Sequence, residues 1–278
     1  MDAIPWIYDH EGIKRRLGYK APDPAALLLR ASARNIQTLR VAAGLPALIP
    51  QSSWAPVDYV TGYPTELIVN QGSLGACVAF SDIGAGARMR YVRRGEILIP
   101  SAFFVYDQIN GGTDNGANIR DSLTVMLDTG APPLSSYTHC IFQAGKNPTG
   151  VPYYKEDVAV TLTTSAECAT AILMGMFPQI PILVTNSFGT FNANGVAWNG
   201  TAPRGGQSNH SVYLAGLRQI AGVWYFIMVN SWGVSWGPWN NGACLIPFAA
   251  VDNPATTDDA WAHADTPSPV DDAPKIAA

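Results

Sequence analysis

The chain is short of charge and of long apolar runs. Only 14% of its 278 residues are charged, whereas an ordinary soluble domain carries about 25%. At this length, the shortage indicates a large share of buried or apolar-lined surface. The longest apolar stretch covers residues 221–229, far below the roughly 18 residues of a membrane helix. We therefore expect no membrane span.

Several signals of targeting and of partner binding are also missing. The N-terminus has an early acid, Asp2, and no apolar run of signal-peptide length. No basic stripe stands out, and the net charge of -4 with a pI near 5.5 argues against a nucleic-acid partner. We expect a protein made without classical secretion, cytoplasmic or carried in a particle.

The cysteines do not have the spacing of a metal site. No CxxC pair occurs, and no histidine lies at ligand spacing, so we expect no zinc, no cofactor and no dense disulfide framework. The four thiols are Cys77, Cys140, Cys168 and Cys244. If one is a nucleophile, three remain, and an odd set cannot pair fully.

Charge divides the chain into three segments. Residues 1–51 carry a net charge of +3, residues 52–250 carry -2, and residues 251–278 carry -5. The first segment is predicted to be a basic arm or short pro-segment with one helix over residues 24–41. The last is predicted to be a solvated acidic tail, because it is mostly Pro, Ala, Thr and Asp. Either end could dock onto a partner.

Between these ends, the pattern changes from helical to strand-like. Apolar spacing predicts helices, whereas β-rich runs between Gly/Asn turns predict strands. The helices are residues 77–94, 119–128 and 166–176; the strands are residues 180–184, 211–217, 224–229 and 243–246. We predict an α+β domain over residues 52–250, with a helical half (52–150) and a β half (151–250).

The candidate nucleophile is Cys77, in the first turn of the predicted helix 77–94. There, backbone N–H groups and the helix dipole favour a thiolate, so we expect a lowered pKa. A base is needed nearby. His10 and His263 lie in the terminal segments, and His139 has only loop context, which leaves His210 at the start of a predicted strand.

A catalytic histidine also needs a partner that fixes its tautomer. Asn230 follows the next predicted strand, and Trp232 follows it closely enough to shield the Asn-His bond from water. The order is Cys, His, Asn, with separations of 133 and 20 residues. This matches the spacing of papain-like enzymes.

Between about residues 57 and 247, the chain resembles the papain family of cysteine peptidases. Residues 70–81, NQGSLGACVAFS, resemble the nucleophile motif of that family. Residues 208–212, SNHSV, are similar to its histidine motif, and residues 229–237, VNSWGVSWG, to its asparagine motif. Residues 57–59 resemble the start of the mature enzyme, and residues 115–117 resemble the Gly-Gly wall of the substrate cleft.

The resemblance implies a papain-like two-part fold, with a β-barrel-like second half, and a role for each motif residue. Cys77 would attack the peptide carbonyl, His210 would act as the base, and Asn230 would orient it. The Gln71 side chain and the Cys77 backbone N–H would form the oxyanion hole. The residues implied in substrate binding are Gly116, Ala117, Asn209 and Trp232. The expected substrate is a peptide or protein, and no metal is implied.

Departures from the family pattern keep two alternatives open. Leu74 stands where the family has a disulfide cysteine, Ala117 replaces the second cleft glycine, and the N-terminal segment is short. These features are similar to those of family members from bacteria, archaea and their viruses. One alternative is a papain-fold structural or binding module of a larger assembly, such as a phage particle. The other is a peptidoglycan or isopeptide amidase with the same dyad.

Overall fold

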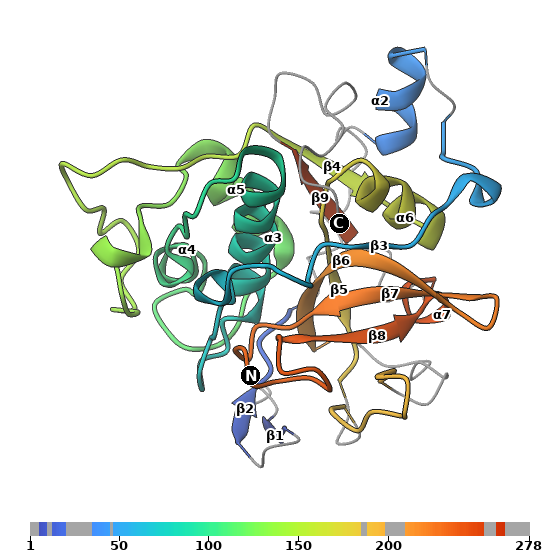
Figure 1. Cartoon of the computed structure of the whole chain (residues 1–278). Helices are drawn as coiled ribbons and strands as arrows, with labels where there is room; N and C mark the ends of the chain where they lie inside the picture. The colour runs from blue at the N-terminus through green and yellow to red at the C-terminus, as the bar shows by residue number, and fades with distance from the viewer. Residues whose placement is uncertain are drawn as a thin grey trace.

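The chain folds into a helical half and a sheet half, which lie side by side in Figure 1. The computed structural model describes residues 6–9, 13–20, 35–44, 47–184, 188–197, 209–252 and 260–264. Within these residues, the helices α3, α4 and α5 gather on one side, and the strands β5 to β8 on the other. The predicted α+β class is confirmed.

The helical half consists of three helices: α3 (Cys77–Arg94), α4 (Ala102–Ile109) and α5 (Ile119–Asp128). Both α3 and α5 have the predicted bounds. Helix α4 was not predicted from the sequence, although Ser101 caps it by accepting a hydrogen bond from the Phe104 N–H. Two 3-10 turns, Thr65–Leu67 and Leu134–Ser136, flank these helices along the chain.

The other half is one seven-stranded sheet in which every pairing is antiparallel. The strand order is β4-β9-β5-β6-β7-β8, and β3 pairs with β6. The strands are β3 (Val57–Asp58), β4 (Val158–Leu162), β5 (Pro178–Ile182), β6 (His210–Ile220), β7 (Val223–Val229), β8 (Ala243–Pro247) and β9 (Ala260–Ala264). β5 begins two residues before the predicted strand. Helices α6 (Ser165–Leu173) and α7 (Phe248–Val251) complete this half.

Helix α3 packs into the apolar cores of both halves. Its first turns, from Cys77 to Ile83, belong to the apolar core of the helical half. Its later residues Ala85, Met89 and Val92 belong to the core built around the sheet. Because one buried helix reaches both cores, the position of Cys77 is fixed relative to both halves.

The C-terminal segment is not a solvated tail throughout. Residues 260–264 form β9, which pairs with β4 along its length and with the start of β5. Trp261 and His263 are buried there. The prediction of a tail from residue 251 was wrong for this strand, because a composition averaged over 28 residues hid five that fit a sheet. Residues 265–278, and any docking through them, lie outside the described residues.

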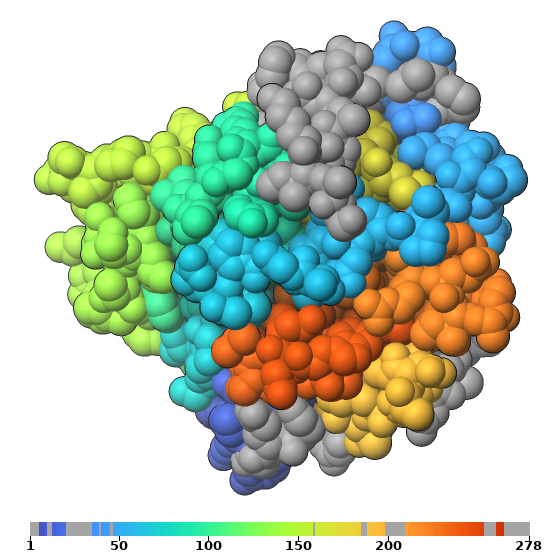
Figure 2. Space-filling view, in the orientation of Figure 1, coloured from blue at the N-terminus to red at the C-terminus, as the bar shows by residue number. Residues whose placement is uncertain are grey.

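The N-terminal segment is packed onto the body in two places. A hairpin of β1 (Trp6–Tyr8) and β2 (Lys14–Arg16) lies at the lower edge in Figure 2, next to the segment that precedes α3. Helix α2 (Ile36–Ala42) packs on α6, and the 3-10 turn Gln51–Ser53 leads into β3. The predicted helix 24–41 is therefore described only from Ile36, because residues 21–34 lie outside the described residues. No described helix is long and apolar enough to cross a membrane.

Candidate active site

Cys77 is the first residue of α3, at the junction of the two halves. Its side chain is fully buried, and this burial raises the pKa of the thiol to about 11. Backbone N–H groups of Gly18, Ser211 and Val78 face the sulfur and act in the opposite direction. The expectation of a lowered pKa for Cys77 is wrong in this structure. The loss of hydration raises the pKa by more than the N-terminus of α3 lowers it.

His210 begins β6 and is oriented by Asn230, which directly follows β7. The His210 Nε2 atom lies 2.8 Å from Asn230 Oδ1. Because an amide oxygen can only accept a hydrogen bond, Nε2 carries the ring proton. The buried Nδ1 atom has no hydrogen-bond partner among the described residues. The next residue, Ser211, directs its backbone N–H at the Cys77 sulfur. His210, which carries the unprotonated Nδ1, is therefore at the end of β6 that contacts the thiol.

The electrostatics of His210 suit a neutral base. Burial lowers the pKa of His210 to about 4, although the hydrogen bond to Asn230 opposes the shift. Aromatic rings enclose this pair: the Trp232 ring centroid lies 5.1 Å and that of Phe188 6.4 Å from the imidazole. Trp236 packs against Trp232 at 5.7 Å. These rings exclude water from the His-Asn hydrogen bond, which strengthens it.

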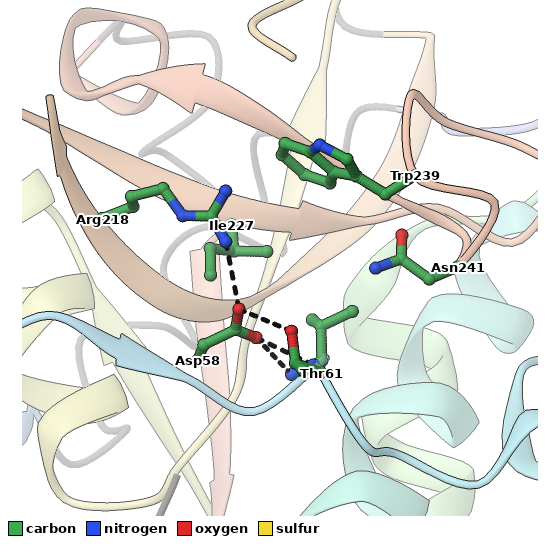
Figure 3. Close-up of a pocket in the computed structure, with 7 residues that line it drawn as sticks. Asp58, Thr61, Arg218, Ile227, Trp239 and Asn241 are labelled. Atoms are coloured by element: carbon green, nitrogen blue, oxygen red, sulfur yellow. Dashed lines mark hydrogen bonds and ion pairs between the residues drawn. The ribbon is translucent and has the colours of Figure 1, made fainter. Parts of the chain in front are cut away.

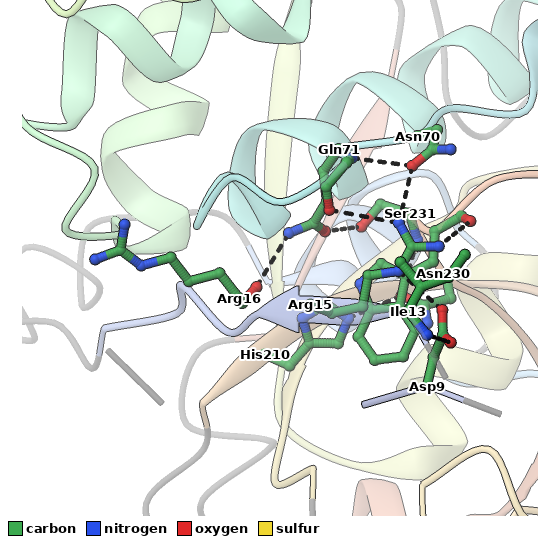
Figure 4. A network of polar contacts seen from close by, with 11 residues as sticks. Asp9, Ile13, Arg15, Arg16, Asn70, Gln71, His210, Asn230 and Ser231 are labelled. Atoms are coloured by element: carbon green, nitrogen blue, oxygen red, sulfur yellow. Dashed lines mark hydrogen bonds and ion pairs between the residues drawn. The ribbon is translucent and has the colours of Figure 1, made fainter. Parts of the chain in front are cut away.

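Gln71 is buried and bound to the same network (Figure 4). Its Oε1 atom accepts a hydrogen bond from the Ser231 hydroxyl, and its backbone N–H donates to Ser231 O at 2.9 Å. Its Nε2 atom donates to Leu74 O at 2.7 Å and to Arg16 O at 3.3 Å. Gln71 thus presents an amide donor to a carbonyl oxygen that comes from the N-terminal segment.

The stretch that supplies this carbonyl, residues 16–20, is called the cleft segment here. It pairs with the residues predicted to bind substrate. The Tyr19 N–H donates to Asn209 O at 3.2 Å, the Lys20 N–H to Ala117 O at 2.8 Å, and the Ala117 N–H to Gly18 O at 2.8 Å. Asn209 also holds Val184 through its side-chain amide. The cleft segment therefore lies against the residues predicted to bind substrate, and its Gly18 N–H faces the Cys77 sulfur.

This close fit depends on two glycines. A Cβ on Gly18 would lie 1.8 Å from Gly75 O, and a Cβ on Gly116 would lie 2.1 Å from Gly18 O. Gly116 also has a φ of 75°, which favours glycine. Any side chain at Gly18 would have to push the cleft segment away from the protein body.

Arg15 anchors the cleft segment from the N-terminal side (Figure 4). Its buried guanidinium contacts Asp9 Oδ2 at 2.9 Å and Trp232 O at 3.3 Å. It also reaches Asn70 Oδ1 and Gly72 O, both at 3.4 Å. The sequence analysis counted Arg15 only in the net charge of the segment, and no local pattern marks it as an anchor.

Residues 55–245 match the family described as "Papain family cysteine protease". The chain belongs to this papain family. Of the predicted site residues, His210 contacts Asn230 and Trp232, whereas Ala117 and Asn209 contact the cleft segment, whose Gly18 faces Cys77.

Mouse pro-cathepsin H is 24% identical over 64% of the chain and 55% of its own length. Mouse cathepsin K is 26% identical over 68% and 58%. The chain thus spans a little over half the length of these relatives. Procathepsin L 3 of Tenebrio molitor larval midgut has the same fold, with a TM-score of 0.64 and 20% identity over 87% of this chain and 79% of that one.

Two other features of the described residues, a pocket and a buried ionic cluster, have the composition of a possible functional site. A pocket of about 260 Å³ lies between β3 and β6 (Figure 3), but its Arg218 is already paired with Asp58 at 3.1 Å and lies over the Trp239 ring. These polar groups satisfy one another, so we interpret the pocket as structural. It contains none of the predicted site residues.

The second feature is a buried cluster of two carboxylates and a histidine. His263 contacts Glu156 through Nδ1, and its Nε2 lies 3.3 Å from Asp82 Oδ1. The three residues lie close enough to hold a metal ion. However, the carboxylates face opposite nitrogens of the ring, whereas one metal ion binds only one of them. We interpret the cluster as an ion triad that ties β9 to α3.

Proposed function

We propose that the chain is a cysteine endopeptidase that cleaves peptide bonds through a thioester on Cys77. The observation that carries this proposal is the orientation of His210. Asn230 holds the proton on Nε2, so Nδ1 is left to take the proton from the thiol. His210 begins β6, which packs on α3, and the N–H of the next residue, Ser211, faces the Cys77 sulfur. A binding module would have no need of that pairing.

The reaction follows from these groups. As Cys77 Sγ attacks the scissile carbonyl, His210 Nδ1 accepts the thiol proton and later gives it to the leaving amine. The Gln71 amide, which already donates to Arg16 O, together with the Cys77 N–H would stabilise the developing oxyanion. Water then attacks the thioester and releases the acid product and the thiol. The substrate would be an extended peptide in the groove that residues 16–20 now fill.

We also propose that residues 1–51 act as a short pro-segment. The cleft segment directs a backbone N–H, not a carbonyl carbon, at the Cys77 sulfur, so the thiol is covered by a group that it cannot attack. The names of two similar proteins, pro-cathepsin H and procathepsin L 3, describe proforms. The exposed turn Gln51–Ser53 is a candidate place for removal of the segment.

The test of the catalytic proposal compares the full chain with Cys77→Ala. Under reducing conditions, an epoxide-type thiol inhibitor should label only chains with Cys77, and casein hydrolysis should depend on the same residue. Cys140→Ala is the matched control, because this thiol is partly exposed and lies outside the site. If the Gly18→Ala chain, with its cleft opened, neither takes the label nor cleaves casein, the proposal is wrong. Cleavage of cell walls but not casein would favour the amidase.

The pro-segment is tested by intact mass after incubation at mildly acidic and neutral pH. A cut near Ser52 or Ser53 would show that the chain removes its own N-terminal segment. An unchanged mass would mean that the segment stays attached. In either case, Gly18→Ala should raise the initial rate of hydrolysis, and an unchanged rate would contradict inhibition by the cleft segment.

A further inference from the structure

One acidic side chain beside the predicted cleft residues, Asp114, forms an ion pair with an arginine of the cleft segment. Asp114 precedes the wall residues Gly116 and Ala117, and its Oδ2 lies 2.5 Å from Nη1 of Arg16 in the cleft segment. Both side chains are largely buried, with 18% of Asp114 and 22% of Arg16 exposed. The pair is therefore better shielded from water and salt than an ordinary surface ion pair.

The two oxygens of Asp114 have different partners. Oδ1 accepts hydrogen bonds from the Gly75 N–H at 2.8 Å and from the Tyr106 hydroxyl at 2.7 Å. Tyr106 in turn accepts the Gly116 N–H at 3.0 Å. The protein body thus holds Oδ1 rigidly, whereas within the described residues Oδ2 contacts only Arg16. When the cleft segment leaves, Oδ2 faces the cleft as a negative acceptor in need of a cation.

The place of Arg16 in the cleft relates this carboxylate to the reaction. The backbone carbonyl of Arg16 accepts a hydrogen bond from Gln71 Nε2, which is where the scissile carbonyl oxygen would lie in the proposed function. The Arg16 side chain meets Asp114, which is bonded to Gly75, two residues before Cys77. A substrate residue with its carbonyl at Gln71 can therefore send its side chain to the same carboxylate.

We propose that Asp114 makes this subsite selective for a basic side chain, so that peptides with Arg or Lys at the residue that supplies the scissile carbonyl are preferred. This inference rests on the proposed peptidase function and specifies its substrate class. Arg16 then occupies the subsite in the covered state in place of that substrate residue. Arginine and lysine both suit the site, because only one carboxylate oxygen, Oδ2, contacts the cation and a single contact does not need the guanidinium fork.

The experiment uses the full chain and three fluorogenic peptides that differ only at this residue: Arg, Lys or Gln. The readout is the ratio of kcat/KM values for Arg and Gln. Because the cleft segment competes equally with every substrate, its effect cancels in the ratio. We expect the wild-type ratio to be about tenfold to a hundredfold, the range for a hydrogen bond to a charged group.

The key variant is Asp114→Asn. Its amide oxygen can still accept from Gly75 and Tyr106, so the cleft wall is kept while the charge is lost. We expect the ratio to fall to within about threefold of one. Asp128→Asn is the matched control, because it makes the same charge change at the far, exposed end of α5 and should keep the wild-type ratio.

Two outcomes would overturn the inference. The first is equal cleavage of the Arg and Gln peptides by the wild type. The second is an Asp114→Asn variant that keeps the wild-type ratio. In both, the peptidase function stands, whereas failure to cleave any of the peptides, even by Gly18→Ala, would remove both proposals.

Discussion

The two buried histidines of the sheet, His210 in β6 and His263 in β9, are held in opposite charge states. Both are completely buried, and burial by itself lowers the pKa of each. His210 meets a neutral amide, and its pKa falls to about 4. His263 meets the carboxylates of Glu156 and Asp82, which raise its pKa to about 9. The partner, not the depth of burial, decides whether the imidazole is a base or a fixed cation.

The largest effect should come from removing the neutral histidine. We expect His210→Gln to lower kcat/KM by about a thousandfold or more, because the variant loses the base that takes the thiol proton. The thermal midpoint should change little, since glutamine can still hydrogen-bond Asn230. Hydrolysis of a fluorogenic peptide and a thermal melt of the same sample measure both. If the thermal midpoint fell strongly together with the rate of hydrolysis, His210 would be mainly structural.

The reverse pattern is expected for His263→Gln. Without the imidazolium, the buried carboxylates of Glu156 and Asp82 face each other unpaired, and the free energy of unfolding should fall by about 3–5 kcal/mol. Denaturant melts measure this loss. The kcat/KM per folded molecule should stay at the wild-type value.

The control for that loss is the triple variant that adds Glu156→Gln and Asp82→Asn. It should recover part of the lost stability, because it removes the unpaired charges. No recovery would mean that the packing of the ring, and not its charge, is what the fold needs.

The dependence of stability on pH should separate the two histidines further. The pKa of His263 is raised above its ordinary value of 6.5, so its stabilisation is complete below pH 6.5 and is lost as pH rises through about 9. Burial raises the pKa of Asp82 to about 7, which acts in the same direction between about pH 4 and 7. For His210, with a lowered pKa, stability is lost as pH falls from 6.5 toward 4.

We therefore expect wild-type unfolding free energy to fall by up to about 3 kcal/mol between pH 6.5 and 9.5. His263→Gln should flatten this alkaline part of the curve. His210→Gln should change only the acid part, where stability should then fall as pH rises because the contribution of Asp82 is no longer offset. Denaturant melts at intervals across pH 4–10 measure both. An alkaline loss that persists in His263→Gln would contradict the assignment of charge to this residue.

The smallest expected effect concerns the cation that anchors the cleft segment. Arg15→Gln keeps a donor toward Trp232 O but leaves Asp9 without its cation. We expect hydrolysis by the full chain to rise about threefold to tenfold, because the cleft segment dissociates more often. The stability of the body should not change. A Lys14→Gln chain is the control, because Lys14 belongs to the same hairpin but is exposed and contacts the Trp6 ring.

Local patterns predicted the parts of the fold that local forces determine. The bounds of α3 and α5 follow from their apolar spacing and end signals, and the Cys, His and Asn residues follow from motifs in chain order. Helix α4 was missed because its sequence AFFVYDQI is apolar on nearly every face and shows no clear period. The short strand β9 was missed because its pairing with β4 and β5 joins residues about 80 to 105 positions apart.

Separation along the chain also explains why the contacts of the site could not be predicted from local patterns. Arg16 and Asp114 are 98 residues apart, and each alone is an ordinary charged residue. His263 was set aside because it stands in a polar terminal segment, although the strand around it is buried. The covered thiol could not be foreseen either, because the pKa of Cys77 depends on the segment packed over it rather than on its own helix.

The central claim is that a neutral Cys77–His210 pair lies beneath the cleft segment. It is tested most directly by the rate at which iodoacetamide alkylates Cys77 at pH 7 in the full chain and in Gly18→Ala, followed by peptide mass with Cys140 as internal standard. A Cβ at position 18 would clash with Gly75 O and should displace the segment. We predict at least a roughly tenfold faster reaction of Cys77 in Gly18→Ala, with Cys140 unchanged. Equal rates for Cys77 in the two chains would contradict the account.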